Sequence, residues 1–235
     1  MRGIIYIAHG SKMPEKNEKF RQFVAKVIAE RPETVQRIAF LEKDDENVPL
    51  VAGEMLALGV TEFLVMPMLL FPAMHAQEDI PMQLASVLKG RATYHIAECF
   101  GDEESVWRVA LKRLQSAEGL VMVTAHGSRR FSKPDVMLKA VVARMQEETK
   151  QPITAAMLYG ALSFEEQLKR LDAERITIMP YFLFDGHLVR KIKRLSQPFI
   201  AAGRTIQFTE TLDLDESMVK AVLSRLEALD VSCHA

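Results

Sequence analysis

The sequence predicts an α/β protein made of two similar modules, each a four-stranded parallel sheet flanked by helices. Short apolar runs rich in β-branched residues alternate with segments whose apolar residues recur at helical spacing. The whole pattern occurs twice in 235 residues, and the tetrapeptide Ala-His-Gly-Ser follows the first apolar run each time, at 8–11 and 125–128. Strands that alternate with helices of this length form a parallel sheet covered on both faces.

In the first module, the run at 4–8 is bounded by glycine and predicts a buried strand. Gly59 stands where a left-handed helix cap is expected, after the second helix. The expected strands are 4–8, 35–41, 63–70 and 92–97, and the expected helices are 20–28, 49–58, 80–88 and 103–114.

The second module repeats this order. Its expected strands are 120–125, 153–158, 176–182 and 205–208, and its expected helices are 136–145, 164–171, 188–200 and 218–229. His9 corresponds to His126, the run 66–71 to 179–184, and His75 to His187. Three landmarks in the same order indicate a tandem duplication. We expect modules at 1–117 and 118–235, without a long linker.

Composition excludes several classes of protein. The formal net charge is −1, so no overall field favours nucleic acid or a membrane surface. The two cysteines match no metal or redox spacing, and the apolar run at the N-terminus is too short for a signal peptide or membrane span. We expect a soluble cytoplasmic protein with no nucleic-acid or membrane partner.

Three side chains with metal-binding or proton-accepting chemistry follow successive strands of the first module. His9 ends the first strand, Glu42 ends the second, and His75 comes just after the third. Ligands of parallel α/β sheets collect beyond the carboxyl ends of the strands, so the three can converge. Two imidazoles and a carboxylate can bind a divalent first-row metal and leave coordination positions open. A neutral imidazole can also accept a proton.

Structural interpretations stand beside this one. His-Gly-Ser can be a tight turn in which Ser11 caps the next helix, His75 can be a half-buried loop residue, and Glu42 a solvated strand end. The recurrence of both histidines in the second module favours function. The methionines are expected to fill gaps in the core, and His95 and His234, which lack a counterpart, to be structural.

Taken together, these residues resemble the sirohydrochlorin chelatases, class II enzymes that insert iron or cobalt into sirohydrochlorin for siroheme or cobalamin synthesis. The resemblance rests on residues 8–11, on 40–42, and on 67–71 leading to the His-Ala-Gln-Glu-Asp-Ile-Pro run at 75–81, and it covers nearly the whole chain. It implies chelatase-like modules with the active cleft between them. His9 would be a metal ligand and proton acceptor, and His75 a metal ligand.

The resemblance also implies a tetrapyrrole site and no organic cofactor, with Fe²⁺ or Co²⁺ as substrate. Because sirohydrochlorin carries several carboxylates, we expect cations at its binding site. The residues expected to bind it are Ser11, Lys12, Glu42, Leu70, Phe71, Pro72, Ala73, Met74, Arg129 and Arg130. Lys133, Arg190, Lys191, Lys193 and Arg194 are further candidates, or form a solvated basic face.

The second module departs from the motif. Tyr159 stands where the first module has Glu42, and Lys191-Ile192-Lys193 replaces Asp79-Ile80-Pro81. We therefore expect His9, Glu42 and His75 to perform catalysis, and His126 with His187 to form a second or vestigial site. The fused pair leads us to expect a monomer. A metal or tetrapyrrole carrier without turnover stays open as an alternative, as does the choice among iron, cobalt and nickel.

Overall fold

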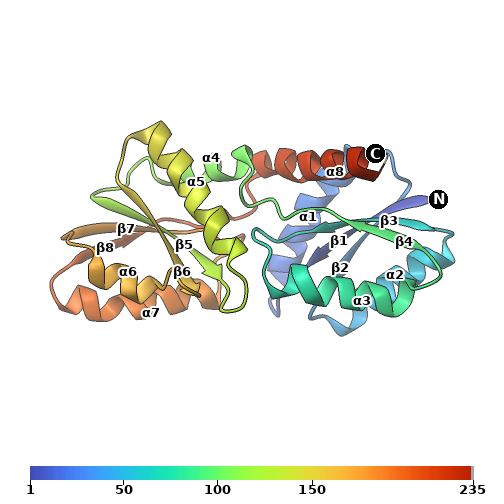
Figure 1. Ribbon diagram of the computed structural model, residues 1–235, viewed down its shortest axis with the longest axis horizontal. Coiled ribbons are helices and arrows are strands. Elements are labelled where there is room, and N and C mark those ends of the chain that lie inside the picture. The colour runs from blue at the N-terminus through green and yellow to red at the C-terminus, as the bar shows by residue number, and fades with distance from the viewer. Residues whose placement is uncertain (234–235) are drawn as a thin grey trace. The chain divides into compact units, whose positions relative to one another are not determined.

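The computed structural model describes residues 1–233 and contains two four-stranded parallel sheets (Figure 1). The first has the order β2-β1-β3-β4, with bounds β1 Arg2–Ala8, β2 Val35–Phe40, β3 Glu62–Pro67 and β4 Thr93–Ile96. The second has the order β6-β5-β7-β8, with bounds β5 Leu120–Gly127, β6 Ile153–Tyr159, β7 Arg175–Pro180 and β8 Thr205–Phe208. The predicted fold class is confirmed.

The two sheets share one register. Ala8 pairs with Phe40 in the first sheet, and Ala125 pairs with Met157 in the second. Likewise Ile7 pairs with Pro67, and Thr124 with Pro180. Since a slip by one residue would turn every side chain to the other face, this agreement confirms the duplication residue by residue.

Helices cover the sheets at the positions expected from apolar spacing, with ends shifted by a few residues. Their bounds are α1 Pro14–Ala29, α2 Val48–Ala57, α3 Ile80–Leu88, α4 Glu104–Arg113, α5 Lys133–Thr149, α6 Phe164–Arg170, α7 His187–Ala201 and α8 Val219–Cys233. Short helical segments lie at η1 Asp44–Glu46, η2 His75–Asp79 and η3 Glu216–Met218. Gly59 has the expected left-handed conformation, with φ of 89°.

The third strand of each module is shorter than predicted. The strands expected over 63–70 and 176–182 end at Pro67 and Pro180. Proline has no N–H to donate, and one further bond to the neighbouring strand follows it in each sheet before the chain leaves the sheet, from Met68 N–H to the Ile7 carbonyl at 2.7 Å and from Tyr181 N–H to the Thr124 carbonyl at 2.8 Å. Residues 68–74 therefore form a connection that leads from the sheet to His75.

The central strands are buried on both faces. Ile4, Ile5, Tyr6 and Ile7 of β1 have no exposed surface, and Leu64 to Met66 of β3 are equally buried. Tyr6 donates its hydroxyl to Gln36 Oε1 at 2.7 Å, which satisfies a polar group inside this core.

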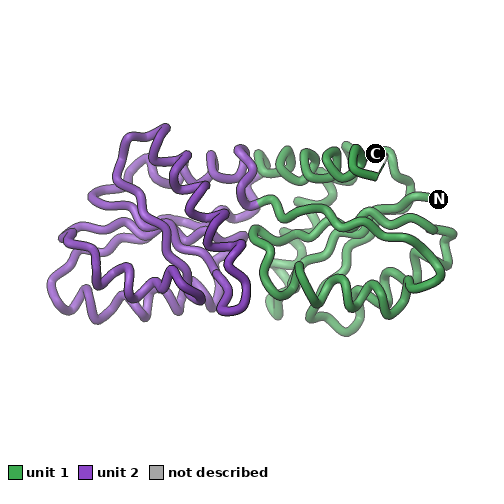
Figure 2. Tube along the Cα trace, viewed as in Figure 1, with its two compact units in different colours: residues 1–100, 216–235 green, residues 101–215 purple. Residues whose placement is uncertain are grey.

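The compact units differ from the modules expected at 1–117 and 118–235. Unit 1 comprises residues 1–100 and 216–235, and unit 2 comprises residues 101–215 (Figure 2). The two fourth helices are exchanged: α8 packs against α1, β3 and β4, while α4 packs against α5. Ion pairs Lys26–Glu216 at 2.8 Å and Arg31–Asp230 at 2.8 Å accompany the packing of α8. Helical periodicity cannot indicate which sheet a helix covers, because either sheet offers an apolar face.

Among the residues described, no helix is long and apolar enough to span a membrane.

Candidate metal and tetrapyrrole site

His9 lies directly after β1, where the chain turns at Gly10. Gly10 has φ of 93°, a conformation that favours glycine, and a Cβ at this position would lie 3.3 Å from Cβ of Phe40. The N–H of Glu42 donates to the carbonyl of His9 at 3.1 Å. This bond places Glu42 beside His9, and His9 Nε2 lies 3.3 Å from Glu42 Oε2.

Asn17 of α1 fixes the loop that follows His9. Its Oδ1 accepts from the Ser11 N–H at 2.9 Å, and its Nδ2 donates to the Ser11 carbonyl at 2.7 Å. The Ser11 hydroxyl accepts from the N–H of Met13 at 3.1 Å. The N-cap of α1 is Met13 and makes no side-chain capping bond. The alternative in which Ser11 caps this helix is therefore wrong, although the tight turn is present.

His75 begins η2, a five-residue π-helical segment that runs into α3. The N–H of Ile80 donates to the carbonyl of His75 across the wider turn. His75 Nδ1 lies 2.6 Å from Asp79 Oδ2, four residues on. A carboxylate accepts hydrogen bonds, so Nδ1 carries the proton and Nε2 presents its lone pair. Such carboxylate–histidine pairs orient imidazoles that bind metals.

The two imidazoles of unit 1 lie side by side. Their ring centroids are 4.9 Å apart, with an angle of 47° between the planes. The side chains of His9 and His75 are 43% and 40% exposed, so ions and water reach both rings. The structure thus brings together the three residues predicted from the ends of different strands.

In this arrangement the ligand atoms of His9, Glu42 and His75 do not all lie within 4.8 Å of one another. Among the described residues, the three donors whose ligand atoms all lie within 4.8 Å of one another are Glu62, His95 and Cys233, in another part of unit 1. A metal bound by His9, Glu42 and His75 would therefore draw their side chains closer by rotation.

The trio of Glu62, His95 and Cys233 is less suited to a divalent ion. Arg2 donates to Glu62 Oε1 from Nε at 3.1 Å and from Nη2 at 2.7 Å. A guanidinium this close to a ligand oxygen repels a divalent cation. We therefore place the candidate metal site at His9, Glu42 and His75.

The loop that carries Glu42 is held by its neighbour Glu46. Arg21 of α1 donates to Glu46 Oε2 at 2.6 Å, and Lys43 also binds this carboxylate. Burial favours the protonated form of Glu46, but the two hydrogen-bonded cations outweigh it and lower the pKa of Glu46. The ionised carboxylate thus ties the loop after β2 to α1.

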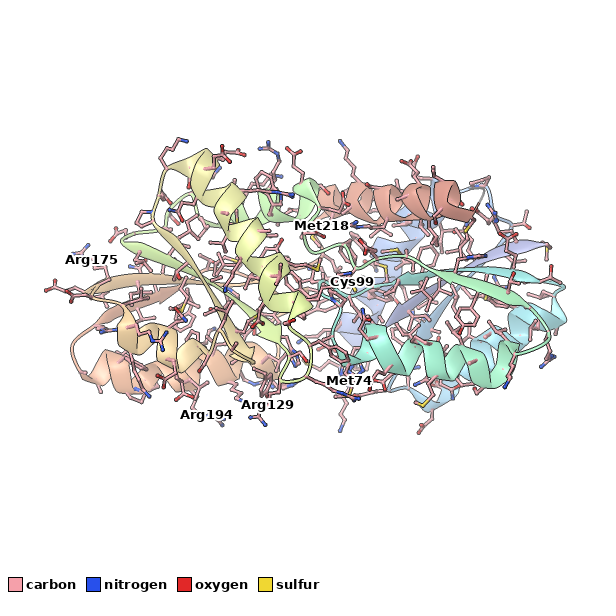
Figure 3. All side chains as sticks on the ribbon, in the orientation of Figure 1. Met74, Cys99, Arg129, Arg175, Arg194 and Met218 are labelled. Carbon is pink, nitrogen blue, oxygen red and sulfur yellow. The ribbon has the colours of Figure 1, made fainter. Side chains whose placement is uncertain are left out.

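The expected tetrapyrrole-binding segment 70–74 is only partly accessible. Leu70, Phe71 and Ala73 are half-buried, and Pro72 is buried. Met74 is 47% exposed and is labelled in Figure 3. Lys12, beyond the Ser11 turn, is exposed.

Unit 2 has a different arrangement at the equivalent positions. Gly127 pairs with Tyr159, which places this tyrosine where the first sheet has Glu42. The His126 and Tyr159 rings are 5.1 Å apart between centroids. Lys191 Nζ donates to the Tyr159 hydroxyl at 2.9 Å, and the Arg129 guanidinium lies 5.6 Å from the centroid of the same ring. Arg129 is exposed and is labelled in Figure 3.

His187 is the first residue of α7, which continues without a π-helical segment. The position of Asp79 is occupied by Lys191, which contacts Tyr159. Unit 2 thus keeps both imidazoles and replaces both carboxylates, one by a phenol and one by an ammonium group.

An α/β fold with two histidines and two carboxylates at open strand ends has the donor set of a protein that binds a divalent transition metal and leaves coordination positions open. The model of the CbiX family matches residues 3–117 and again 120–229. The chain belongs to the CbiX family, with one family module in each half.

Curated relatives extend over most of the chain. A sirohydrochlorin ferrochelatase of Bacillus subtilis (strain 168) is 25% identical over 95% of this chain and 90% of its own length. A sirohydrochlorin cobaltochelatase of Priestia megaterium is 27% identical over 88% of this chain and 72% of its own.

Solved structures of a chelatase from Bacillus subtilis share the fold. SirB with Fe³⁺ has a TM-score of 0.84 at 21% identity and covers 99% of this chain and 97% of its own. SirB from subspecies spizizenii, in complex with cobalt, has a TM-score of 0.82 at 21% identity, with 97% and 94% covered.

Sequence reasoning missed two residues of the site. Asp79 was noted as part of a motif, but its bond to His75 was not predicted, although the spacing of four residues is a usable signal. Asn17 gave no signal, because an asparagine in the first turn of a helix has many uses.

Proposed function

We propose that this protein is a sirohydrochlorin ferrochelatase or cobaltochelatase, a lyase that inserts Fe²⁺ or Co²⁺ into sirohydrochlorin in siroheme or cobalamin biosynthesis. The observation that carries the proposal is the convergence of His9, Glu42 and His75 in a chain of the CbiX family. The named relatives act on the same tetrapyrrole with these two metals.

The metal is a substrate, held by His75 through Nε2 and by His9. The hydrogen bond that His75 Nδ1 donates to Asp79 fixes the His75 ring and raises its basicity as a ligand. Two imidazoles with one nearby carboxylate form an incomplete coordination sphere, in contrast to the closed four-ligand cage of structural metal sites. Such a sphere allows the ion to pass to the four ring nitrogens of the tetrapyrrole.

His9 also accepts protons once the metal has left its ring for the tetrapyrrole. Metal insertion releases two pyrrole protons, and a neutral imidazole within hydrogen-bond reach, which has one free lone pair, takes them one at a time. Glu42, 3.3 Å from His9 Nε2, stabilises the imidazolium that forms and passes the proton to solvent, to which its side chain is 61% exposed.

The test is turnover with purified protein, sirohydrochlorin and either metal, followed by absorbance. We expect many equivalents of metallated product per chain. Replacing His9 by Ala should lower kcat/KM at least ~100-fold, which is the usual contribution of a proton acceptor. His75→Ala should raise the metal concentration needed for half-maximal rate.

His95→Ala is the matched control and should retain wild-type activity. A single stoichiometric change in the spectrum would support the carrier without turnover. His126→Ala should keep most activity, and a loss equal to that of His9→Ala would contradict catalysis by the first unit alone.

A further inference from the structure

The second unit keeps the histidines of the metal site but reverses the charge around them. In unit 1, the imidazoles stand beside the carboxylates Glu42 and Asp79. The shared strand register puts Tyr159 at the position of Glu42 in unit 2, and the spacing of four residues from His187 puts Lys191 at the position of Asp79. Two negative charges are thus replaced by one positive charge, since a phenol is neutral at pH 7.

Two cations contact the ring of Tyr159. Lys191 donates to its hydroxyl at 2.9 Å, and its Nζ lies 4.3 Å from the ring centroid. Arg129, whose counterpart in the first loop is Lys12, lies over the same ring at 5.6 Å. Neither cation has a carboxylate partner among the described residues, whereas Lys43, Lys169 and Arg108 do.

A divalent metal is disfavoured at this place. The ammonium group of Lys191 is held against Tyr159, whose ring contacts His126. Its positive charge repels a metal cation, and it supplies no negatively charged oxygen as a ligand. Lys191 is also half-buried, so its positive charge is partly desolvated and is stabilised when an anion binds beside it.

We propose that Arg129, Tyr159 and Lys191 form a carboxylate-binding site, which accepts a carboxylate side chain of the tetrapyrrole. The proposal rests on the proposed function for the identity of the ligand. Arginine offers a planar pair of N–H donors that matches a carboxylate, and lysine adds a compact charge. The tyrosine holds the lysine in place and separates it from His126. The duplicated metal site has thereby become an anion site on the same backbone.

Binding of metal-free sirohydrochlorin, measured by fluorescence titration, tests this assignment without requiring turnover. Lys191→Ala and Arg129→Ala should each weaken binding about tenfold, as expected for loss of a charge-assisted hydrogen bond. Higher salt should reduce the difference in sirohydrochlorin affinity between each variant and the wild type, because salt screens the charge that the variants lack. In turnover, both variants should raise KM for the tetrapyrrole and leave kcat within about twofold.

Lys139→Ala is the matched control, because Lys139 is an exposed lysine of the same unit on α5. It should bind sirohydrochlorin like the wild type. Unchanged binding by Lys191→Ala and Arg129→Ala would overturn the carboxylate site. So would tight binding of inorganic phosphate that depends on Lys191 while tetrapyrrole binding does not.

Restoring the carboxylates gives a second, independent test. The double variant Tyr159→Glu with Lys191→Asp should gain one Co²⁺ per chain in equilibrium dialysis, and should bind sirohydrochlorin more weakly. Wild type and His126→Ala should bind the same amount of Co²⁺. A loss of Co²⁺ in His126→Ala would show a metal in unit 2 and contradict the proposal.

The two proposals fail separately. If the protein binds sirohydrochlorin through Lys191 but does not metallate it, the enzymatic function is wrong and the carboxylate site stands. If it metallates sirohydrochlorin equally well with and without Lys191, the function stands and the carboxylate site is wrong.

Discussion

His75 and Asp79 illustrate how one contact sets the chemistry of a side chain. The carboxylate of Asp79 fixes which nitrogen of His75 carries the proton, at an Nδ1–Oδ2 distance of 2.6 Å. In the neutral ring the remaining nitrogen, Nε2, presents its lone pair to a metal, and the ring cannot rotate freely. The corresponding His187 has Lys191 at this spacing in place of a carboxylate.

Asp79→Ala should weaken Co²⁺ binding by ten- to a hundredfold and lower chelatase activity to a similar extent, because His75 loses the carboxylate that orients it. Isothermal titration with Co²⁺ measures the first effect. Asp172→Ala, at an exposed aspartate of unit 2, is the control and should behave as wild type. Wild-type affinity in Asp79→Ala would mean that the carboxylate does not support the ligand.

At the scale of elements, the Ala-His-Gly-Ser segments at the ends of β1 and β5 have the same sequence but different amounts of free space around their glycines. Gly127 has φ of 70°, and a Cβ there would overlap the carbonyl oxygen of Tyr159. At Gly10, with φ of 93°, the nearest atom to such a Cβ is Cβ of Phe40 at 3.3 Å. The second turn is thus packed more tightly against its neighbouring strand than the first.

Gly127→Ala should therefore destabilise the protein by at least ~2 kcal/mol more than Gly59→Ala, which adds only the left-handed strain of ~1 kcal/mol. Gly59 is a suitable reference because it has φ of 89° and open space around its Cβ position. Urea unfolding gives both values. An equal loss of unfolding free energy in Gly127→Ala and Gly59→Ala would show that strand β6 moves aside without an energetic cost.

The whole molecule is organised by the exchange of its fourth helices. Helix α8 comes from the end of the chain but buries Ala221, Val222 and Leu226 in unit 1. Arg225 adds an ion pair with Glu98 at 3.5 Å. Folding of unit 1 thus depends on residues that the sequence repeat assigns to the other half.

A chain of residues 1–100 joined to 216–235 by a flexible linker should fold better than the similarly long fragment 1–117. The first contains α8, while the second has only α4, which packs on α5 of unit 2. Thermal unfolding followed by circular dichroism compares them. A cooperative transition in fragment 1–117 at an equal or higher temperature would show that α4 can replace α8.

The strands, most helices and the catalytic candidates could be predicted from local patterns. Buried parallel strands are continuous apolar runs, and their carboxyl ends meet at one edge, so the sequence alone predicts that His9, Glu42 and His75 lie together. The apolar runs continue past Pro67 and Pro180, so the sequence predicts strand there, whereas β3 and β7 end at these prolines. Apolar character shows burial and does not show backbone pairing.

By itself, then, the sequence determined the duplication, the parallel order within each module and the residues at the strand ends. Hydrophobic periodicity and strand register are set within short segments of the chain, so the local sequence is enough to determine them. Tertiary structure decided which unit each fourth helix belongs to, that Asp79 holds His75, and that Lys191 contacts Tyr159. These outcomes depend on packing between segments far apart along the chain, or on side-chain rotation within a turn, and neither is encoded by local spacing.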